Sequence, residues 1–209
     1  MSDTTKARIL DTAERLFAEQ GYGATSLRQI IGGAGVNLAA VHYHFGSKEH
    51  LLEAVFARRI ERVNRERLEM LDRVEAAGEP TLEQVLEALV APTLAVARDP
   101  ERRIFVKIMA RMHVEEELLP LLVNHLRHII PRFRAALRRA LPQLSEVELV
   151  WRTHFAIGAL VHTMVGVDKL QLLTGGQHRP GPNEPSLESV VNFMAAGLRG
   201  CDCGGRHAH

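Results

Sequence analysis

The stretch from Gly21 to Lys48 combines basic, imidazole and small apolar side chains and contains no acidic residue. Its basic and imidazole side chains are Arg28, His42, His44 and Lys48, and His50 follows shortly after. A surface of this kind favours contact with a phosphate backbone, because a carboxylate there would repel the phosphates. The chemistry available is therefore noncovalent: charge pairing with phosphates, and hydrogen bonding or apolar contact with base edges.

The helix predicted over residues 37–44 carries several of these side chains on one face. Val36, Val41 and Phe45 have the spacing to pack against a core. The side chains left pointing outward are Leu38, Ala39, Ala40, His42, Tyr43 and His44. Phenol and imidazole groups hydrogen-bond to base edges or phosphates, and small apolar groups fit against thymine methyls. This face suits a DNA major groove; the alternative is the solvated surface of an ordinary helical bundle.

Two short helices joined by a tight turn must position this face. The first begins with a capping box, Ser26–Gln29, and the turn runs from Gly35 to Asn37. Neither helix is long enough to be stable alone, so both must pack on the longer helix predicted over residues 4–20. That arrangement is typical of a helix-turn-helix, in which the second helix enters the major groove and the first braces it.

The remaining sequence predicts an all-α fold, because apolar residues recur at helical spacing throughout. We expect about nine helices, beginning near residues 4, 26, 37, 47, 81, 100, 118, 145 and 186. Pro131 is expected to kink the helix over residues 118–141. The run from Phe155 to Leu173 is apolar on nearly every side, which predicts a helix buried all round.

We predict three parts: a helix-turn-helix DNA-binding domain (1–46), a larger helical ligand-binding and dimerisation domain (47–199), and a disordered tail (200–209). The net charge of +1 does not by itself demand a nucleic-acid partner, so the case depends on where charges lie. The N-terminus is polar, no apolar run could span a bilayer, and the only cysteines are Cys201 and Cys203. These features predict a cytoplasmic protein.

The segments Thr25–Ile30 and Gly35–Leu51 closely resemble the signature of the tetracycline-repressor family of bacterial regulators, and the match covers residues 5–60. The resemblance implies phosphate contacts by Thr25, Ser26, Arg28 and Lys48. It also implies that Leu38, Ala39, Ala40, His42, Tyr43 and His44 face the groove.

Two positions depart from the family pattern. Gly32 and Gly33 stand where helix-favouring residues are usual and cost about 1 kcal/mol each, which predicts a loose second helix. His42 replaces the commoner tyrosine, so the familiar base contact does not carry over.

A subgroup of regulators of fatty-acid and acyl-CoA metabolism is similar to this chain through the segments Asn37–Phe45, Glu83–Pro92 and Leu141–Gly158 together. A small apolar ligand such as a fatty acid or acyl-CoA is therefore expected. The residues predicted to line its site are Phe105, Met109, Met112, Trp151, His154 and Phe155. The alternatives are plain core packing of these side chains, and a repressor of a drug-efflux gene that responds to other ligands.

The last two predicted helices carry more apolar surface than one protomer needs, which predicts a homodimer and a near-palindromic operator. The residues assigned to this contact are Leu160, Val161, Met164, Val165, Leu170, Leu173, Val190, Val191, Met194 and Leu198. The arginines between Arg58 and Arg67 alternate with glutamates, which predicts a charged helix face and no second DNA patch.

Metal binding or catalysis is the rival from a different class. His113 with Glu116 and Glu117, and His125 with His128, have helical spacing usable for a metal. The tail offers Cys201, Cys203, His207 and His209, without the paired spacing of a structural zinc site. The sequence contains no nucleophile motif and no phosphate-cradling glycine loop, so we expect neither an enzyme nor a cofactor.

Overall fold

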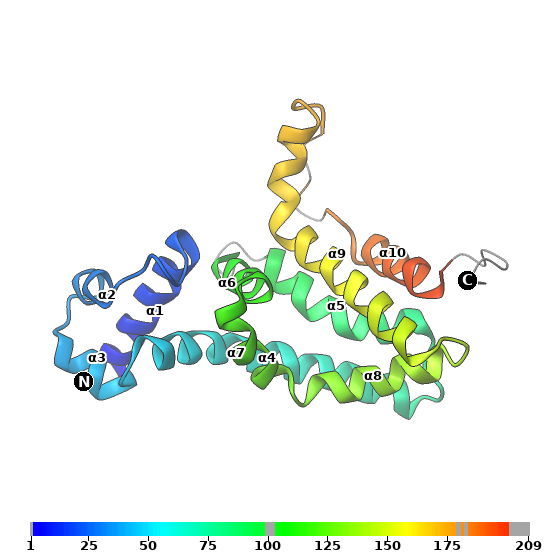
Figure 1. Cartoon of the computed structure of the whole chain (residues 1–209), viewed down its shortest axis with the longest axis horizontal. Helices are drawn as coiled ribbons and strands as arrows, with labels where there is room; N and C mark the ends of the chain where they lie inside the picture. Colours follow the sequence, from blue (N-terminus) through cyan, green and yellow to red (C-terminus); the bar gives the residue numbers. More distant parts are fainter. Residues whose placement is uncertain (1, 99–102, 179–180, 182–183, 201–209) are drawn as a thin grey trace. The chain divides into compact units, whose positions relative to one another are not determined.

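The computed structural model describes residues 2–98, 103–178, 181 and 184–200. The elements are α1 (Ser2–Gln20), α2 (Leu27–Ala34), α3 (Leu38–Phe45), α4 (Lys48–Ala76), α5 (Leu82–Arg98), α6 (Arg103–Val114), η1 (Glu116–Leu118), α7 (Leu119–Leu126), α8 (Ile129–Ala140), α9 (Glu146–Leu173) and α10 (Leu187–Arg199), as Figure 1 shows. The all-α prediction is confirmed. The described residues form ten α-helices and one 3-10 helix, slightly more than the nine predicted.

The extra elements come from the segment predicted as one kinked helix, residues 118–141. Here η1 leads directly into α7, and two residues separate α7 from α8. Pro120 lies in the first turn of α7, and Pro131 is the third residue of α8. A proline has no N–H to donate, which is harmless in the first turn of a helix and disruptive further in. The helix therefore ends and restarts where the sequence predicts a kink.

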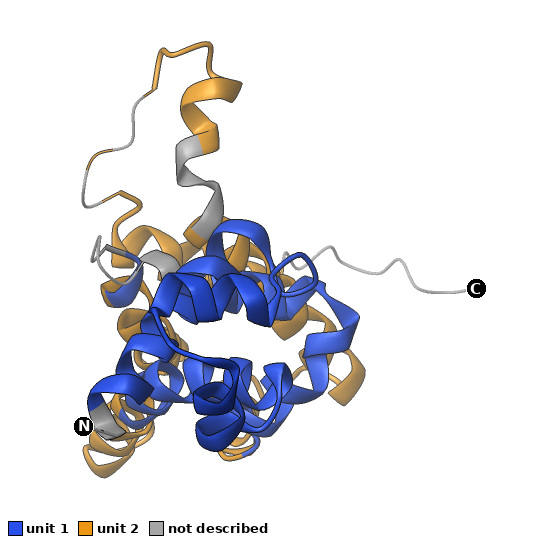
Figure 2. Cartoon of the chain, turned by 90° about the vertical axis from the view of Figure 1, so that its left-hand side faces the viewer, with its two compact units in different colours: residues 1–65, 96–127 blue, residues 66–95, 128–209 orange. Residues whose placement is uncertain are grey.

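The chain divides into two compact units, drawn in different colours in Figure 2. The first joins residues 1–65 to 96–127, and the second joins residues 66–95 to 128–209. Residues 1–46 fall inside the first unit, which also holds the first part of α4 together with α6 and α7. The domain boundary after residue 46 stays a prediction, and residues 201–209 of the predicted tail lie outside the described residues.

Close approach between α1 and α2 depends on Gly33 and Gly35. A Cβ on Gly33 would lie 2.8 Å from Thr12 Cγ2 of α1, well inside van der Waals contact. Gly35 ends α2 in the left-handed region, with φ +60°, and the Arg8 guanidinium donates hydrogen bonds to its carbonyl and to the carbonyl before it. Gly33 thus has a packing role that the sequence did not reveal, whereas a Cβ on Gly32 would meet no atom within 4 Å.

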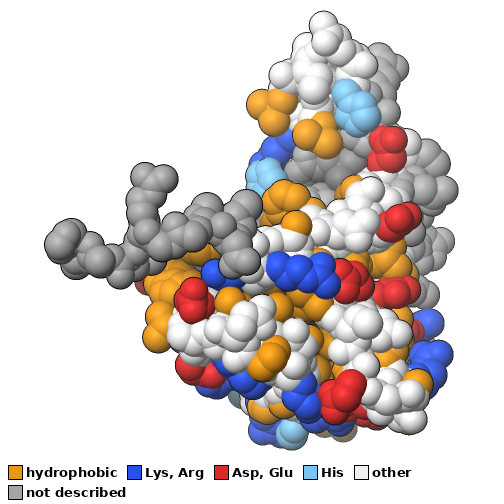
Figure 3. Space-filling view, turned by 90° about the vertical axis from the view of Figure 1, so that its right-hand side faces the viewer, with side chains coloured by type: hydrophobic (Ala, Val, Ile, Leu, Met, Phe, Trp, Pro, Cys, Tyr) orange, Lys and Arg blue, Asp and Glu red, His pale blue; other side chains and the backbone are white. Residues whose placement is uncertain are grey.

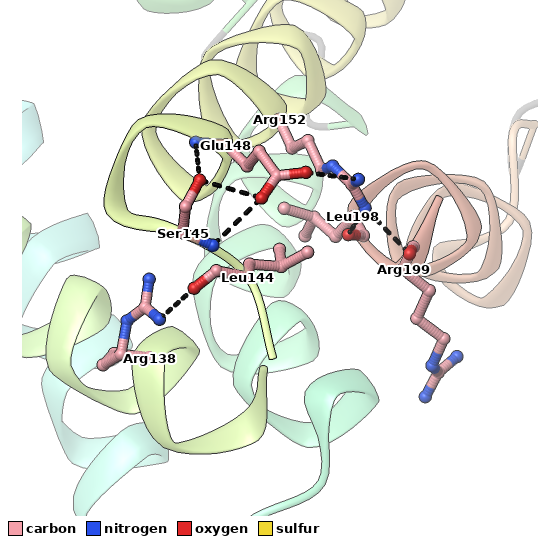
Figure 4. A network of polar contacts seen from close by, with 7 residues as sticks. All are labelled: Arg138, Leu144, Ser145, Glu148, Arg152, Leu198 and Arg199. Carbon is pink, nitrogen blue, oxygen red and sulfur yellow. Dashed lines mark hydrogen bonds and ion pairs between the residues drawn. The ribbon is translucent and has the colours of Figure 1, made fainter. Parts of the chain in front are cut away.

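In the second unit, the start of α9 is tied to the end of α10 (Figure 4). The Ser145 hydroxyl accepts a hydrogen bond from the Glu148 N–H (3.2 Å), and the Glu148 carboxylate accepts one from the Ser145 N–H (3.0 Å). Glu148 also pairs with Arg152 (3.3 Å), whose Nη1 donates to the carbonyls of Leu198 (3.0 Å) and Arg199 (2.8 Å). Helices leave their last carbonyls unpaired, so this guanidinium completes α10 and fixes it against α9.

The expectation that α9 is buried all round is wrong for the single chain. Leu149 and Leu160 are buried, but Trp151 is 55% exposed, Phe155 63% and Leu173 80%. The helix has 28 residues, and its C-terminal part extends beyond the other helices of its unit (Figure 1). Apolar side chains also lie among charged ones on the face drawn in Figure 3. No described helix is both long enough and apolar enough to cross a membrane.

The two neighbouring glycines of α2 give a matched pair of variants. Gly32→Ala should stabilise the fold by about 1 kcal/mol, because alanine favours helix and nothing obstructs its methyl group. In Gly33→Ala the same gain is opposed by an overpacking cost of about 1–3 kcal/mol against Thr12. Thermal unfolding should therefore show a higher Tm for Gly32→Ala and an unchanged or lower Tm for Gly33→Ala. Equal increases in the two variants would contradict the packing role of Gly33.

Candidate nucleic-acid interface

The start of α2 exposes two of the predicted phosphate-contacting side chains. Ser26 caps the helix: its hydroxyl accepts a hydrogen bond from the Gln29 N–H (3.3 Å), and its own N–H donates to the Gln29 side chain (2.8 Å). Ser26 and Arg28 are both exposed. Both are therefore accessible to a phosphate, and their assignment as DNA contacts stays a prediction.

Thr25 has a different place from the one that the resemblance implies. Its side chain is buried, with 1% of its surface exposed. Its hydroxyl donates toward the carbonyls of Gly21 (2.7 Å) and Leu16 (3.2 Å), and its N–H donates to the Tyr22 carbonyl (3.3 Å). Because these donors are used inside the protein, the geometry favours a structural role for Thr25, which closes the loop between α1 and α2.

α3 turns Val41 and Phe45 inward and most of the predicted groove-facing residues outward. Val41 and Phe45 are buried, and the Asn37 side chain caps the helix by accepting a hydrogen bond from the Ala40 N–H (2.8 Å). Among the large apolar side chains of α3, Tyr43 is the most exposed, with 82% of its surface accessible. Of the six predicted groove residues, Leu38, Ala39, His42 and Tyr43 are exposed, and Ala40 and His44 are half-buried.

The His42 imidazole is oriented by the turn that follows α3. Its Nδ1 lies 2.8 Å from the carbonyl oxygen of Gly46, and since a carbonyl only accepts, Nδ1 carries the proton. In the neutral ring Nε2 is then an acceptor. An exposed acceptor at this position matches the amino groups of adenine or cytosine in the major groove.

Lys48, at the first position of α4, lies against a residue that the sequence analysis missed. Its Nζ is 4.2 Å from the centroid of the Tyr22 ring. The Tyr22 hydroxyl donates to Glu49 Oε1 at 2.8 Å, and the ring packs against Phe17 with centroids 5.7 Å apart. Tyr22 belongs to no helical period, so the only signal for it in the sequence was an aromatic residue inside the acid-free stretch.

The six predicted ligand-lining residues divide between the two units. Phe105, Met109 and Met112 are buried in the first unit, where Phe105 stacks on Phe56 with centroids 5.5 Å apart. Trp151, His154 and Phe155 are exposed on α9 in the second unit, and their rings contact one another. Among the described residues, these three are therefore on the surface, and their assignment to a ligand site stays a prediction. A ligand site that uses the buried three stays a prediction.

The residues assigned to the dimer contact are also divided. Five of them are buried within the chain, where α9 packs against α10: Leu160, Val190, Val191, Met194 and Leu198. The prediction is wrong for these, because they serve the protomer's own core. Leu170 and Leu173 are exposed, Val161 and Met164 are half-buried, and the side chain of Val165 lies outside the described residues. The exposed aromatic residues Trp151, Phe155 and Phe193 offer apolar surface in their place.

Metal binding finds no support in the part of the chain that the structure describes. There, no three His, Cys, Asp or Glu side chains are grouped so as to hold an ion. His113 Nδ1 instead lies 2.9 Å from the Met109 carbonyl oxygen. The Cys201, Cys203, His207 and His209 alternative lies outside the described residues.

Comparison with known proteins gives matches to two family models and to curated regulators. Residues 9–55 match the family model "Bacterial regulatory proteins, tetR family", and residues 87–197 match "Tetracyclin repressor-like, C-terminal domain". The chain is 31% identical over 105 residues to the regulator AcrR of Shigella flexneri, covering 50% of this chain and 47% of AcrR. It is 32% identical over 112 residues to the regulator TtgW of Pseudomonas putida, covering 54% of this chain and 77% of TtgW.

Solved structures extend the similarity over the whole fold. The regulator FadR of Bacillus subtilis, solved with stearoyl-CoA, superposes with a TM-score of 0.61 at 17% identity, covering 91% of this chain and 98% of FadR. The sequence match to AcrR, by contrast, spans only about half the length of AcrR. Because models of both the N-terminal and the C-terminal domain match, and the second alone covers more than half of the residues, this chain belongs to the tetR family of bacterial regulatory proteins.

Proposed function

We propose that this protein is a ligand-responsive transcriptional regulator, most simply a repressor, that binds DNA through α3. The observation that carries the proposal is the outward face of α3 and its surroundings. Leu38, His42 and Tyr43 are exposed on a helix held by buried Val41 and Phe45, in a stretch without acidic residues. Membership of the tetR family supports this reading.

Binding is proposed to involve a homodimer and a near-palindromic operator. A two-fold dimer presents two copies of α3 to successive turns of the major groove, which is how helix-turn-helix proteins reach two half-sites. The surface proposed for the contact is the aromatic face of α9, formed by Trp151, His154 and Phe155, with Phe193 on α10. Large exposed apolar patches of this kind are rare on monomers, and burial in a partner would remove them from water.

The ligand is proposed to be apolar or amphipathic, such as a fatty acid or acyl-CoA, and to enter the core of the first unit. Phe105, Met109 and Met112 lie there, and flexible methionines adapt to an inserted chain. His125 supplies a polar group: its Nε2 is buried, with no hydrogen-bond partner among the described residues, and its ring meets Phe56 edge-on at 5.3 Å. Burial lowers the pKa of His125, so the ring is neutral and suits an uncharged oxygen of a ligand.

A repressor of a drug-efflux gene, the alternative that the sequence left open, stays the second candidate. The acyl candidate is supported by FadR of Bacillus subtilis, which has a similar fold and was solved with stearoyl-CoA. The two candidates differ in the ligand that releases DNA and share the DNA-binding surface.

Lys48→Ala tests the DNA-binding surface. Loss of one phosphate contact should reduce the slope of log K against log salt by about 1 per protomer on any duplex. Lys107→Ala removes the same charge from an exposed site on α6 and should leave the slope unchanged. Fluorescence anisotropy with labelled duplex DNA at several salt concentrations measures both.

Tyr43→Ala serves as the contrast within this experiment. It removes an exposed groove-facing ring and no charge, so it should weaken preference between sequences and keep the salt slope. An unchanged slope in Lys48→Ala would show that Lys48 does not contact phosphate.

Phe155→Glu tests the dimer surface. Because a carboxylate in an apolar contact costs several kcal/mol unless it is paired, the variant should sediment as a monomer and lose operator affinity. Val114→Glu introduces the same carboxylate at a site that is 79% exposed in the first unit, and this variant should remain a dimer. Analytical ultracentrifugation decides, and a monomeric wild-type protein would contradict the proposal at once.

The ligand is tested with a series of fatty acids and acyl-CoAs of increasing chain length. The Tm should increase with length, since each buried CH₂ contributes about 0.8 kcal/mol, and DNA should be released in the same order. His125→Phe should weaken the response while keeping the length dependence. Indifference to every acyl compound, together with DNA release by planar cationic drugs, would favour the efflux candidate.

A further inference from the structure

We propose that Tyr22 is a positioning residue for DNA binding: it holds the Lys48 ammonium on its ring and the Glu49 carboxylate at its hydroxyl, and so keeps the two charges apart. The inference rests on the proposed function, because it concerns the same contact with the DNA backbone. Tyr22 lies outside the predicted DNA-contacting set.

The ring face of Tyr22 suits a lysine that must remain available to a phosphate. Lys48 Nζ is 4.2 Å from the ring centroid, within the range of a cation–π interaction. A ring face attracts the ammonium without accepting a conventional hydrogen bond, so the N–H donors of Lys48 stay free for phosphate oxygens. The interaction also restricts a long, flexible side chain before DNA arrives, which reduces the entropy lost on binding.

Glu49 is the negative charge that Tyr22 would hold away from the Lys48 ammonium. It is the first acidic residue after the acid-free stretch, directly follows Lys48, and is exposed in the first turn of α4. A carboxylate in the first turn stabilises the helix through the helix dipole. The same carboxylate would repel phosphates and attract the neighbouring ammonium. The Tyr22 hydroxyl donates to Glu49 Oε1 at 2.8 Å. The same side chain thus directs the anion to its polar end and the cation to its face.

The surroundings keep Tyr22 in place and protonated. Its ring packs on buried Phe17, with centroids 5.7 Å apart. Burial raises the pKa of Tyr22, and the hydrogen bond to Glu49 and the charges of Glu49 and Glu117 raise it further. The hydroxyl therefore remains a donor at neutral pH. A hydrogen bond from its own backbone N–H, together with the one from Tyr22, holds the pKa of Glu49 below its ordinary value.

The test compares salt dependence in the full-length protein, with a labelled random-sequence duplex as the probe, from about 50 to about 200 mM salt. Tyr22→Leu removes the ring and the hydroxyl, and should reduce the salt slope by about 1 per protomer, as Lys48→Ala does. The double variant Tyr22→Leu/Lys48→Ala should show no further reduction. Tyr22→Phe keeps the ring and should keep the slope, with affinity lowered by about 2- to 5-fold because Glu49 is released.

Glu49→Gln in the Tyr22→Phe background provides the rescue: removing the released charge should restore wild-type affinity. A merely structural role for Tyr22 would predict no such rescue, and this pair decides the question if Tyr22→Leu fails to fold, which thermal unfolding reports. A wild-type slope in Tyr22→Leu, beside a reduced slope in Lys48→Ala, would overturn the positioning role alone. A wild-type slope in Lys48→Ala would overturn the phosphate contact as well.

Discussion

The close approach of α1 to α2 is the constraint on which the DNA-binding end of this protein depends. α2 and α3 have eight residues each and are too short to persist without a support. Gly33 and Gly35 allow the α1 side chains Thr12 and Arg8 to reach the α2 backbone. The turn that follows leads directly into α3, so the position of α3 depends on this close approach.

Ion pairs connect α1 to α4. Glu14 is 5% exposed and pairs with Arg58 and Arg59 of α4, and Arg58 also pairs with Asp11 at 2.9 Å. These pairs fix α1 on α4 and neutralise carboxylates close in sequence to the DNA-binding stretch. The hydrogen bond from Tyr22 likewise engages Glu49, the carboxylate that directly follows half-buried Lys48.

A buried arginine has a comparable role in the second unit. Pro92 lies inside α5 and cannot donate to the carbonyl four residues earlier, which weakens the helix there. Next to it, Arg67 donates to the carbonyl of Leu89 (3.0 Å) and the hydroxyl of Thr93 (2.6 Å). Burial lowers the pKa of Arg67 to about 10, so the side chain is still protonated at neutral pH. The cation joins α4 to α5 at the point where the proline disturbs the helix.

The helix-turn-helix and most helix boundaries could be predicted from the sequence, because caps, glycine stops and apolar spacing act within a few residues of the chain. The Ser26 and Ser145 capping boxes and the inward Val41 and Phe45 follow from such local rules. Which long side chains meet could not be predicted in this way. Arg58 and Arg67 read as one charged helix face, yet one pairs with α1 and the other is buried against α5. Likewise, the apolar residues of α9 all fit a core, and the position of its neighbours alone exposes Trp151 and Phe155. Periodicity gives the direction of a side chain on its own helix, whereas burial and pairing depend on which side chains other helices place against that face.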